Sequence, residues 1–225
     1  MTLLRQIQEI TESTYQEISG VQLEEFIIGR QRYTRLTDLA RSDASQLSNL
    51  ARTFLRVNED RLYMAIYYSA PMIKILEKYD PRRGLHEKNI HAFTVFVEEL
   101  NHAIHAALKF AAGDTDISNE IFIRDLELLA KVDCYNILKF FLAYFNDSRQ
   151  LENWDRLWLR HHLFDTGDYS YDSTIIRDRY CETNYLGEKY TRFLDGLNPE
   201  NRGGEIRRFR SMNYLQKKDY ILLLP

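Results

Sequence analysis

The sequence predicts a mostly α-helical (α+β) protein, a bundle of five to six helices with a β-hairpin around residues 53–69. Three observations support this fold class. Glycine and proline are scarce, at 9 and 4 of 225 residues, and so few helix breakers favour helices. Apolar residues recur at helical spacing through most of the chain. Only residues 53–69 show the alternation that is typical of strands.

The composition is that of one globular domain over residues 1–225, with 44% hydrophobic and 28% charged residues. The net charge of −3 gives no general attraction to nucleic acid or to anionic membranes. Cys134 and Cys181 form no CxxC pair, so reduced thiols and a cytoplasmic location are expected. No signal-peptide stretch and no run of about 20 apolar residues is present, so no membrane span is expected.

The first 50 residues are expected to form an N-terminal helix and a linker. Leu3, Leu4, Ile7, Ile10 and Ile18 recur at helical spacing within residues 2–19, and Gly20 is well placed to end that helix. Residues 21–52 have no clear pattern. Within them, residues 42–51 are typical of a loop that runs into a turn of helix.

The hairpin prediction rests on residues 53–69. Apolar and aromatic residues alternate on both sides of a polar Asn-Glu-Asp turn at residues 58–60. An isolated hairpin is only marginally stable in water, so we expect it to pack against helices. Ser69 can then cap a helix that has Pro71 in its first turn.

The remaining chain is expected to form a helical bundle over residues 70–219. Segments that combine glycine, proline, asparagine and aspartate interrupt it at residues 80–84, 111–116 and 195–204, and a loop rich in tyrosine and aspartate covers residues 164–172. The expected helices are residues 70–79, 87–112, 116–146, 150–162, 174–196 and 204–219.

One side of the expected helix 87–112 holds His91, Glu98, His102 and His105. At about 100° per residue, these four side chains fall within about 60° of arc. Imidazole and carboxylate suit zinc, iron or manganese, so the four are candidate ligands of a divalent transition metal. The alternative is an ordinary solvated helix face. A ferritin-like di-iron site is disfavoured, because the chain has no second Glu-x-x-His motif.

Asp133 lies in an unexpected place in helix 116–146. It falls in the middle of an apolar arc, and an unpaired buried charge is costly, so it needs a partner. An arginine, a tyrosine hydroxyl, a histidine or a metal could serve. Asp133 is therefore either a core residue with such a partner or a catalytic candidate whose pKa is raised. The arc consists of Phe122, Leu126, Leu129, Ile137, Phe140 and Tyr144.

The other side of the same helix carries Arg124, Glu127 and Lys131. Their spacing of three and four residues is typical of salt bridges within a helix. Glu127 becomes a second catalytic candidate only if it faces the polar stripe of helix 87–112.

Basic residues gather near the C-terminus, at positions 202–218. Arg207, Arg208 and Arg210 are candidates for binding phosphate or an acidic partner, including nucleic acid. The alternative is a solvated face.

The order of motifs resembles an uncharacterised bacterial helical protein family, in which an E-x-x-x-H helix is followed by an L-E-L-x-x-x-V-D helix. Here the first motif is Glu98 to His102, and the second is residues 126–133. The resemblance singles out Glu98, His102, Glu127 and Asp133. It implies no activity, because none is established for that family.

The function expected from the sequence is an intracellular accessory or protein-interaction module, with a protein partner or homo-oligomer and no cofactor. A first alternative is a metal-dependent helical-bundle enzyme that uses Glu98 and His102 with Glu127 or Asp133. A second alternative is a nucleic-acid binder that uses the basic residues 202–218. Nucleotide binding and acyl transfer have no support, because the chain lacks a phosphate-binding glycine loop and a G-x-S-x-G motif.

Overall fold

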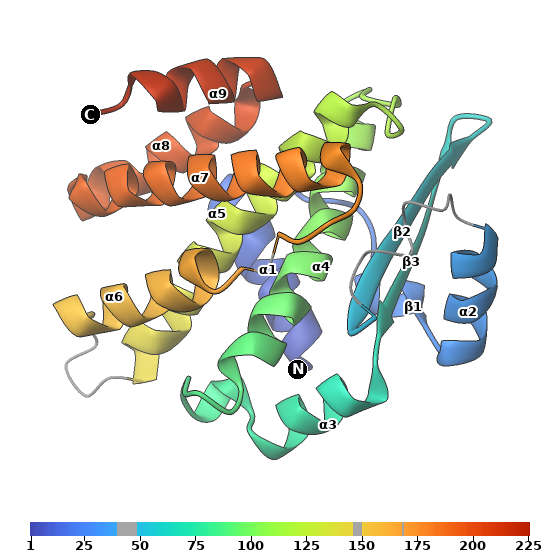
Figure 1. Cartoon of the computed structure of the whole chain (residues 1–225), viewed down its shortest axis with the longest axis horizontal. Helices are drawn as coiled ribbons and strands as arrows, with labels where there is room; N and C mark the ends of the chain where they lie inside the picture. Colours follow the sequence, from blue (N-terminus) through green and yellow to red (C-terminus); the bar gives the residue numbers. More distant parts are fainter. Residues whose placement is uncertain (40–48, 146–149, 168) are drawn as a thin grey trace.

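The strands form one sheet beside a body of helices (Figure 1). The computed structural model describes residues 1–39, 49–145, 150–167 and 169–225. These residues form nine α-helices and one three-stranded sheet, so the expected mostly helical α+β class is confirmed. The helices are α1 (Leu3–Tyr15), α2 (Arg30–Leu39), α3 (Ala70–Lys78), α4 (Ile90–Ala111), α5 (Glu120–Phe145), α6 (Asn153–Arg160), α7 (Thr174–Gly196), α8 (Pro199–Ser211) and α9 (Tyr214–Leu223).

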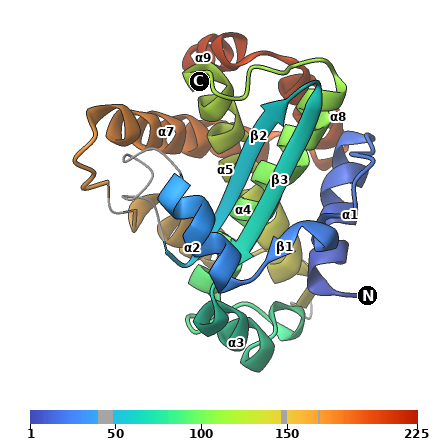
Figure 2. The ribbon, with the colours of Figure 1, turned by 90° about the vertical axis from the view of Figure 1, so that its right-hand side faces the viewer.

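The predicted hairpin is confirmed. β2 (Ala51–Asn58) and β3 (Arg61–Tyr68) pair antiparallel, and Glu59 and Asp60 between them have φ angles of 48° and 56°. Positive φ at both central positions suits the right-handed twist of hairpin strands. A third strand, β1 (Ile27–Ile28), pairs parallel with β3 on the side away from β2 (Figure 2). It was not expected, because two residues are too few to show alternation.

Helices cover both faces of this sheet, which is why the hairpin is stable. On the outer face, Tyr33 of α2 stacks on Tyr67 with ring centroids 4.0 Å apart, and it meets Phe54 edge-on at 6.0 Å. On the inner face, the Thr53 hydroxyl donates to the Glu99 carbonyl of α4 over 2.8 Å. Helix α4 therefore lies between the sheet and α5 (Figure 1).

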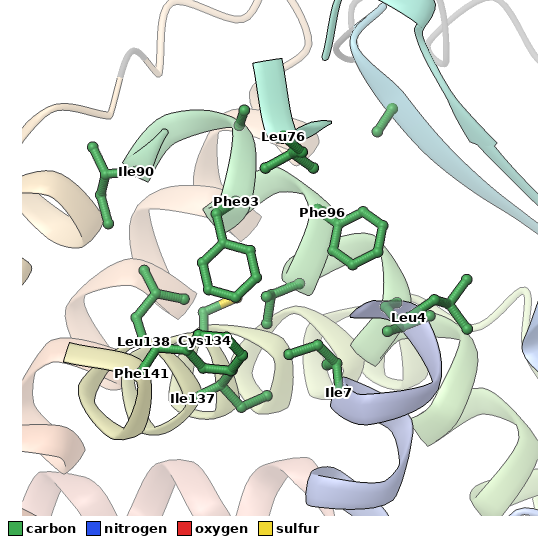
Figure 3. Close-up of a cluster of buried hydrophobic side chains, with 14 of the residues drawn as sticks. Leu4, Ile7, Leu76, Ile90, Phe93, Phe96, Cys134, Ile137, Leu138 and Phe141 are labelled. Atoms are coloured by element: carbon green, nitrogen blue, oxygen red, sulfur yellow. The ribbon is translucent and has the colours of Figure 1, made fainter. Parts of the chain in front are cut away.

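The main core joins α4 and α5 to α1 and the sheet. Phe93 of α4 and Phe141 of α5 meet with ring centroids 4.9 Å apart, and Ile7 of α1 is completely buried beside them (Figure 3). A second core lies between α5, α7, α8 and α9, where Tyr190 and Phe209 stack at 3.8 Å. Helix α5 contributes to both cores, and this explains its apolar residues on several sides.

Two predicted helices have different ends. The helix expected over residues 2–19 ends at Tyr15, because Gln16 adopts a left-handed conformation with φ of 57° and its N–H bonds back to the last turn. The helix expected over residues 204–219 is two helices. Asn213 begins the second one by accepting the Gln216 N–H over 3.0 Å.

Other expectations need smaller corrections. Helix α8 begins at Pro199, so the predicted break over residues 195–204 is shorter than expected. The helix predicted over residues 150–162 is α6 followed by a π-helical turn, His161–Asp165. Most of the loop expected over residues 42–51 lies outside the described residues.

Phe140 and Tyr144, which were expected in the buried arc of α5, are 49% and 58% exposed, and they stack on each other. Periodicity shows which residues share a face, but it does not show where along the helix a neighbour covers that face. Within the described residues, no helix is both long and apolar enough to cross a lipid bilayer.

Candidate ligand-binding site

A cavity of about 650 Å³ lies beside the sheet and reaches the polar side of α4. It is bounded by β2, by α4, by α5 and by the segment that joins α6 to α7. Its polar lining includes Thr53 of β2; His91, Thr94, Glu98, Glu99 and His102 of α4; Glu127 and Lys131 of α5; and His162, Thr166, Tyr169, Tyr171, Arg179 and Tyr180 of the segment from the π-helical turn into α7.

His102 and Glu127 lie face to face at this cavity. His102 Nε2 is 3.4 Å from Glu127 Oε2, and His102 Nδ1 is 3.8 Å from Glu99 Oε2. Only 14% of the His102 side chain and 7% of the Glu127 side chain are exposed. The imidazole therefore lies between two carboxylates, one from its own helix and one from α5.

The two groups shift each other's pKa in opposite directions. Burial opposes a charged imidazole, but the Glu127 and Glu99 carboxylates outweigh burial and raise the pKa of His102 well above its usual value. Burial likewise favours a neutral Glu127, but His102 and Lys131 outweigh it and lower the pKa of that carboxyl. At neutral pH the pair is therefore a histidinium and a carboxylate.

A second buried ion pair stands next to the first. Lys131 Nζ lies 2.8 Å from Glu98 Oε1, and their side chains are 13% and 18% exposed. Burial disfavours the charged amine, but the Glu98 carboxylate outweighs burial and raises the pKa of Lys131. Gly187 of α7 permits this arrangement, since a Cβ at that position would come within 3.1 Å of the Lys131 Cβ. The small residue lets α7 lie close against α5 at the cavity.

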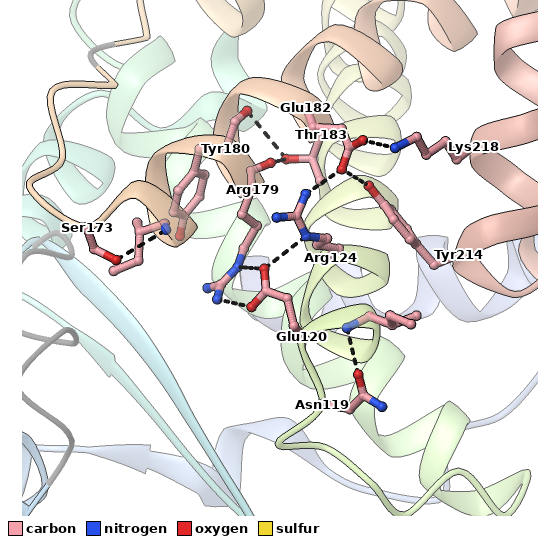
Figure 4. A network of polar contacts seen from close by, with 12 residues as sticks. Asn119, Glu120, Arg124, Ser173, Arg179, Tyr180, Glu182, Thr183, Tyr214 and Lys218 are labelled. Atoms are coloured by element: carbon pink, nitrogen blue, oxygen red, sulfur yellow. Dashed lines mark hydrogen bonds and ion pairs between the residues drawn. The ribbon is translucent and has the colours of Figure 1, made fainter.

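The α7 side of the cavity is fixed by a network of ion pairs (Figure 4). Arg179 Nε donates to Glu120 Oε1 over 3.0 Å, and Arg124 lies between Glu120 and Glu182. Tyr180, the residue after Arg179, stacks on Tyr171 with ring centroids 5.2 Å apart. The network ties the first half of α7 to α5, so Arg179 and Tyr180 are held in place at the cavity.

Three buried polar atoms at this cavity have no hydrogen-bond partner among the described residues. They are Thr94 Oγ1, His102 Nε2 and Glu127 Oε2. Their residues come from two helices and line one space. His102 Nε2 and Glu127 Oε2 still attract each other as an ion pair at 3.4 Å. Buried polar groups are nearly always hydrogen-bonded in folded proteins, so three that lack a hydrogen bond around one cavity require an explanation.

Asp133 belongs to a different cluster, formed with Tyr15 of α1 and His105 of α4. Its Oδ1 accepts the Tyr15 hydroxyl and its Oδ2 accepts His105 Nε2–H, both over 2.6 Å. Asp133 is 4% exposed and His105 is completely buried. The prediction of a buried Asp133 with a polar partner is confirmed. Burial lowers the pKa of His105, so a neutral imidazole donates to the carboxylate.

The predicted polar stripe of α4 is therefore divided. Glu98 and His102 line the cavity, His91 lies at its exposed edge, and His105 faces the core. The alternative of a solvated helix face is wrong, because three of these four residues are buried or largely covered. Helical spacing places residues on one face, but neighbouring helices decide which part of that face reaches solvent.

The described residues contain no group of three or more histidine, cysteine, aspartate or glutamate side chains arranged to hold a metal ion. Glu98 pairs with a lysine, and Asp133 pairs with Tyr15 and His105. The resemblance singled out Glu98, His102, Glu127 and Asp133, and only the first three of these meet at the cavity.

The remaining site candidates are placed as follows. The salt bridges expected among Arg124, Glu127 and Lys131 are wrong, since each pairs outside this set. Of the basic candidates, Arg208 pairs with Glu205, Arg210 pairs with Glu17, and Arg207 is partly buried.

Several cavity residues were not recognised in the sequence. Thr94 was placed only beside the polar stripe, and Arg179 and Tyr180 only within a stretch of the resemblance; none was a site candidate, and they reach the cavity through helix packing. The one available signal was the tyrosine-rich segment 164–172, which contributes Tyr169 and Tyr171. Comparison of the chain with family models, curated proteins and solved structures finds no match.

Proposed function

We propose that this protein binds a small polar organic molecule in the cavity between β2, α4, α5 and α7. The observation that carries the proposal is the convergence of three buried atoms at this cavity: Thr94 Oγ1, which has no hydrogen-bond partner among the described residues, and the His102 Nε2–Glu127 Oε2 ion pair, whose 3.4 Å separation leaves both atoms without a well-formed hydrogen bond. A bound group that accepts from His102 and donates to Glu127 would satisfy both atoms. The volume of about 650 Å³ lies in the range of small-molecule sites, roughly 300–1,000 Å³.

The chemistry of the lining indicates the class of ligand. The charges nearly balance, so a neutral or zwitterionic molecule fits better than a polyanion. Tyrosine rings supply flat apolar surface beside the charged groups, which suits a molecule of amino-acid or nucleoside size. The cations are Arg52, Lys131, Arg179 and the protonated His102, and the carboxylates are Glu98, Glu99 and Glu127.

Binding can be tested with a panel of free amino acids, nucleosides and monosaccharides. A ligand at about ten times its Kd should raise the unfolding midpoint by about 3–6 °C. The same compound should shift the ¹⁵N resonances of the His102 ring, which reports on the cavity directly. Glu127→Gln should weaken binding by about tenfold, because it removes a charged acceptor.

Glu87→Gln is a matched control. Glu87 also pairs with a histidine, His162, over 3.1 Å, but its side chain is 70% exposed. This variant should bind like the unmodified protein. A pH titration followed by the ¹⁵N resonances of the His102 ring checks the ion pair of His102 and Glu127 itself. The pKa of His102 should fall in Glu127→Gln and not in Glu87→Gln. If no panel compound at millimolar concentration moves the midpoint or the His102 resonances, the proposal fails.

The opposite pKa shifts of His102 and Glu127 favour a second proposal, an acid–base enzyme that acts on the bound molecule. Paired groups whose surroundings move their pKa values apart are typical of general acids and bases. His102 keeps its proton at neutral pH and can donate it, and Glu127 stays charged and orients the imidazole.

The second proposal requires turnover of the compound that binds. Incubation followed by mass spectrometry should show conversion, and His102→Gln should reduce the rate by about 10²–10⁴-fold. Unchanged ligand after long incubation would leave a binding protein and exclude this enzyme.

The functions expected from the sequence remain predictions with less support. A metal-dependent enzyme would use Glu98 and His102 with Glu127 or Asp133. Glu98 is paired with Lys131, His102 with Glu127, and Asp133 with Tyr15 and His105. Nucleic-acid binding would use Arg208 and Arg210, and each is in an ion pair. A protein partner or homo-oligomer is tested by pull-down and by size in solution.

A further inference from the structure

A second group of charged residues surrounds Asp195 of α7. Its members on α5 are Tyr135 and Lys139, which lie about two to three turns beyond Glu127. Asp195 Oδ1 contacts Lys139 and lies 3.0 Å from Arg156 Nη1, and its Oδ2 accepts Arg160 Nη2–H over 2.7 Å. Arg202 donates to the Asp195 carbonyl over 3.0 Å. Three cationic side chains therefore contact one carboxylate and a fourth contacts the backbone of the same residue, an excess of three positive charges.

The two oxygens of this carboxylate are fully used. The Tyr135 hydroxyl also donates to Oδ2, so each oxygen already has two partners. Burial lowers the pKa of Lys139, and the neighbouring Arg202 and Arg156 lower it further although Asp195 raises it. Mutual repulsion among these cations is the condition under which an added anion stabilises a site.

A groove of about 640 Å³ opens on this cluster between α5, α6 and α8. Among the described residues, no acidic side chain lines it. Asn136 Nδ2 is buried there without a hydrogen-bond partner among the described residues, and the buried Arg156 Nη1 has the Asp195 carboxylate as its ion-pair partner. The lining combines Lys139, Arg156, Arg202, Asn136 and Gln150 with the apolar residues Phe140, Ala143, Leu151 and Pro199.

We propose that this groove binds an organic phosphate monoester. The phosphate would lie against Lys139, Arg156 and Arg202, and the apolar part of the ligand would lie on Phe140. A site with three excess positive charges suits a dianion better than a monoanionic carboxylate. The 49% exposure of the Phe140 ring leaves room for stacking. The site shares no residue with the cavity at His102, so either proposal can fail without the other.

Phenyl phosphate is the probe, titrated into the full chain at low salt by calorimetry. Saturable binding with Kd of about 1 mM or tighter is expected, and it should weaken as salt is added because the contacts are ionic. Inorganic phosphate should bind more weakly, since it lacks the ring. Benzoate should bind more weakly than phenyl phosphate, since it carries one negative charge.

Arg156→Gln and Arg202→Gln should each weaken phenyl phosphate by about fivefold or more, because each removes a charged donor. Phe140→Ala should weaken phenyl phosphate but leave inorganic phosphate unchanged. This position is exposed, so the variant tests the site without endangering the fold. Arg192→Gln is the control: Arg192 is also on α7, pairs with Glu188 and is 61% exposed, and its loss should change nothing.

The proposal is overturned by any of three results. The first is no saturable binding of phenyl phosphate at about 10 mM and low salt. The second is binding that Arg156→Gln and Arg202→Gln leave intact while circular dichroism shows both folded. The third is equal weakening in Arg192→Gln, which would indicate attraction to the surface as a whole.

Discussion

Asp133 is the residue at which the physical cost of burial is clearest. Its carboxylate is 4% exposed and accepts two hydrogen bonds, one from Tyr15 of α1 and one from His105 of α4. Burial of a charge is tolerated only when partners replace water. The cluster therefore joins three helices through one side chain, and it has no access to the cavity at His102.

Asp133→Ala should lower the free energy of unfolding by about 2–4 kcal/mol, because the Tyr15 hydroxyl and the His105 ring N–H are left buried and unpaired. Tyr15→Phe removes one donor and should cost about 1 kcal/mol. Urea unfolding measures both. Tyr63→Phe, at a 51% exposed ring, is the control and should be neutral. An Asp133→Ala variant as stable as the parent would contradict a structural role for this cluster.

At the scale of elements, the boundary between α8 and α9 depends on Asn213. Its side chain accepts the Gln216 N–H over 3.0 Å, and the Gln216 side chain accepts the Asn213 N–H over 2.9 Å. This reciprocal arrangement satisfies two of the donors that a helix start leaves free. Helix α9 then places Lys217, in its first turn, inside the protein.

Asn213→Ala should lower the free energy of unfolding by about 1 kcal/mol, since it removes the cap while leaving the helix sequence unchanged. Asn213→Asp keeps an acceptor and should be close to neutral. Ser211, which lies just outside the cap, offers Ser211→Ala as a control with little effect. Equal losses for the alanine and aspartate variants in chemical unfolding would show that capping does not stabilise this boundary.

The elements differ in how far the sequence could predict them. The bounds of α4 and α7 were predicted closely, because the apolar faces of these two helices are long and regular. The αL ending at Gln16 and the boundary at Asn213 were missed, since neither position carries glycine or proline. The spacing of apolar residues predicts that a helix is present, but it does not predict where the helix ends. These two ends depend on the backbone angles of Gln16 and on the side chain of Asn213.

The site was predictable only in part. Glu98, His102, Glu127 and Asp133 were recognised as unusual, and three of them line the cavity. Their pairing was not predictable: Tyr15 lies 118 positions from Asp133, and Lys131 pairs across helices with Glu98 instead of within its own helix. Contacts between distant segments depend on the packing of whole helices, which periodicity does not specify.

At the scale of the whole molecule, a chain of buried charges joins the C-terminal helix to the centre. Asp125 of α5 lies 2.6 Å from Lys109 of α4 and 2.7 Å from Lys217 of α9. Lys217 is completely buried and also donates to the Met212 carbonyl over 2.7 Å. Burial lowers the pKa of Lys217 to about 8, and Lys109 and Arg210 contribute although Asp125 raises it.

This pKa makes the attachment of α9 depend on pH. Between about pH 8 and 10.5 the unfolded chain holds a proton that folded Lys217 has lost, so its contribution to stability rises with pH. In Lys217→Met, Asp125 keeps Lys109 as its partner and this dependence disappears. The free energy of unfolding of the parent minus that of the variant should therefore rise by about 2 kcal/mol from pH 7 to 10. Denaturant unfolding at each pH measures this difference, in which the tyrosines and other titrating groups cancel. Parallel curves for the two proteins would show that Lys217 titrates as an ordinary lysine.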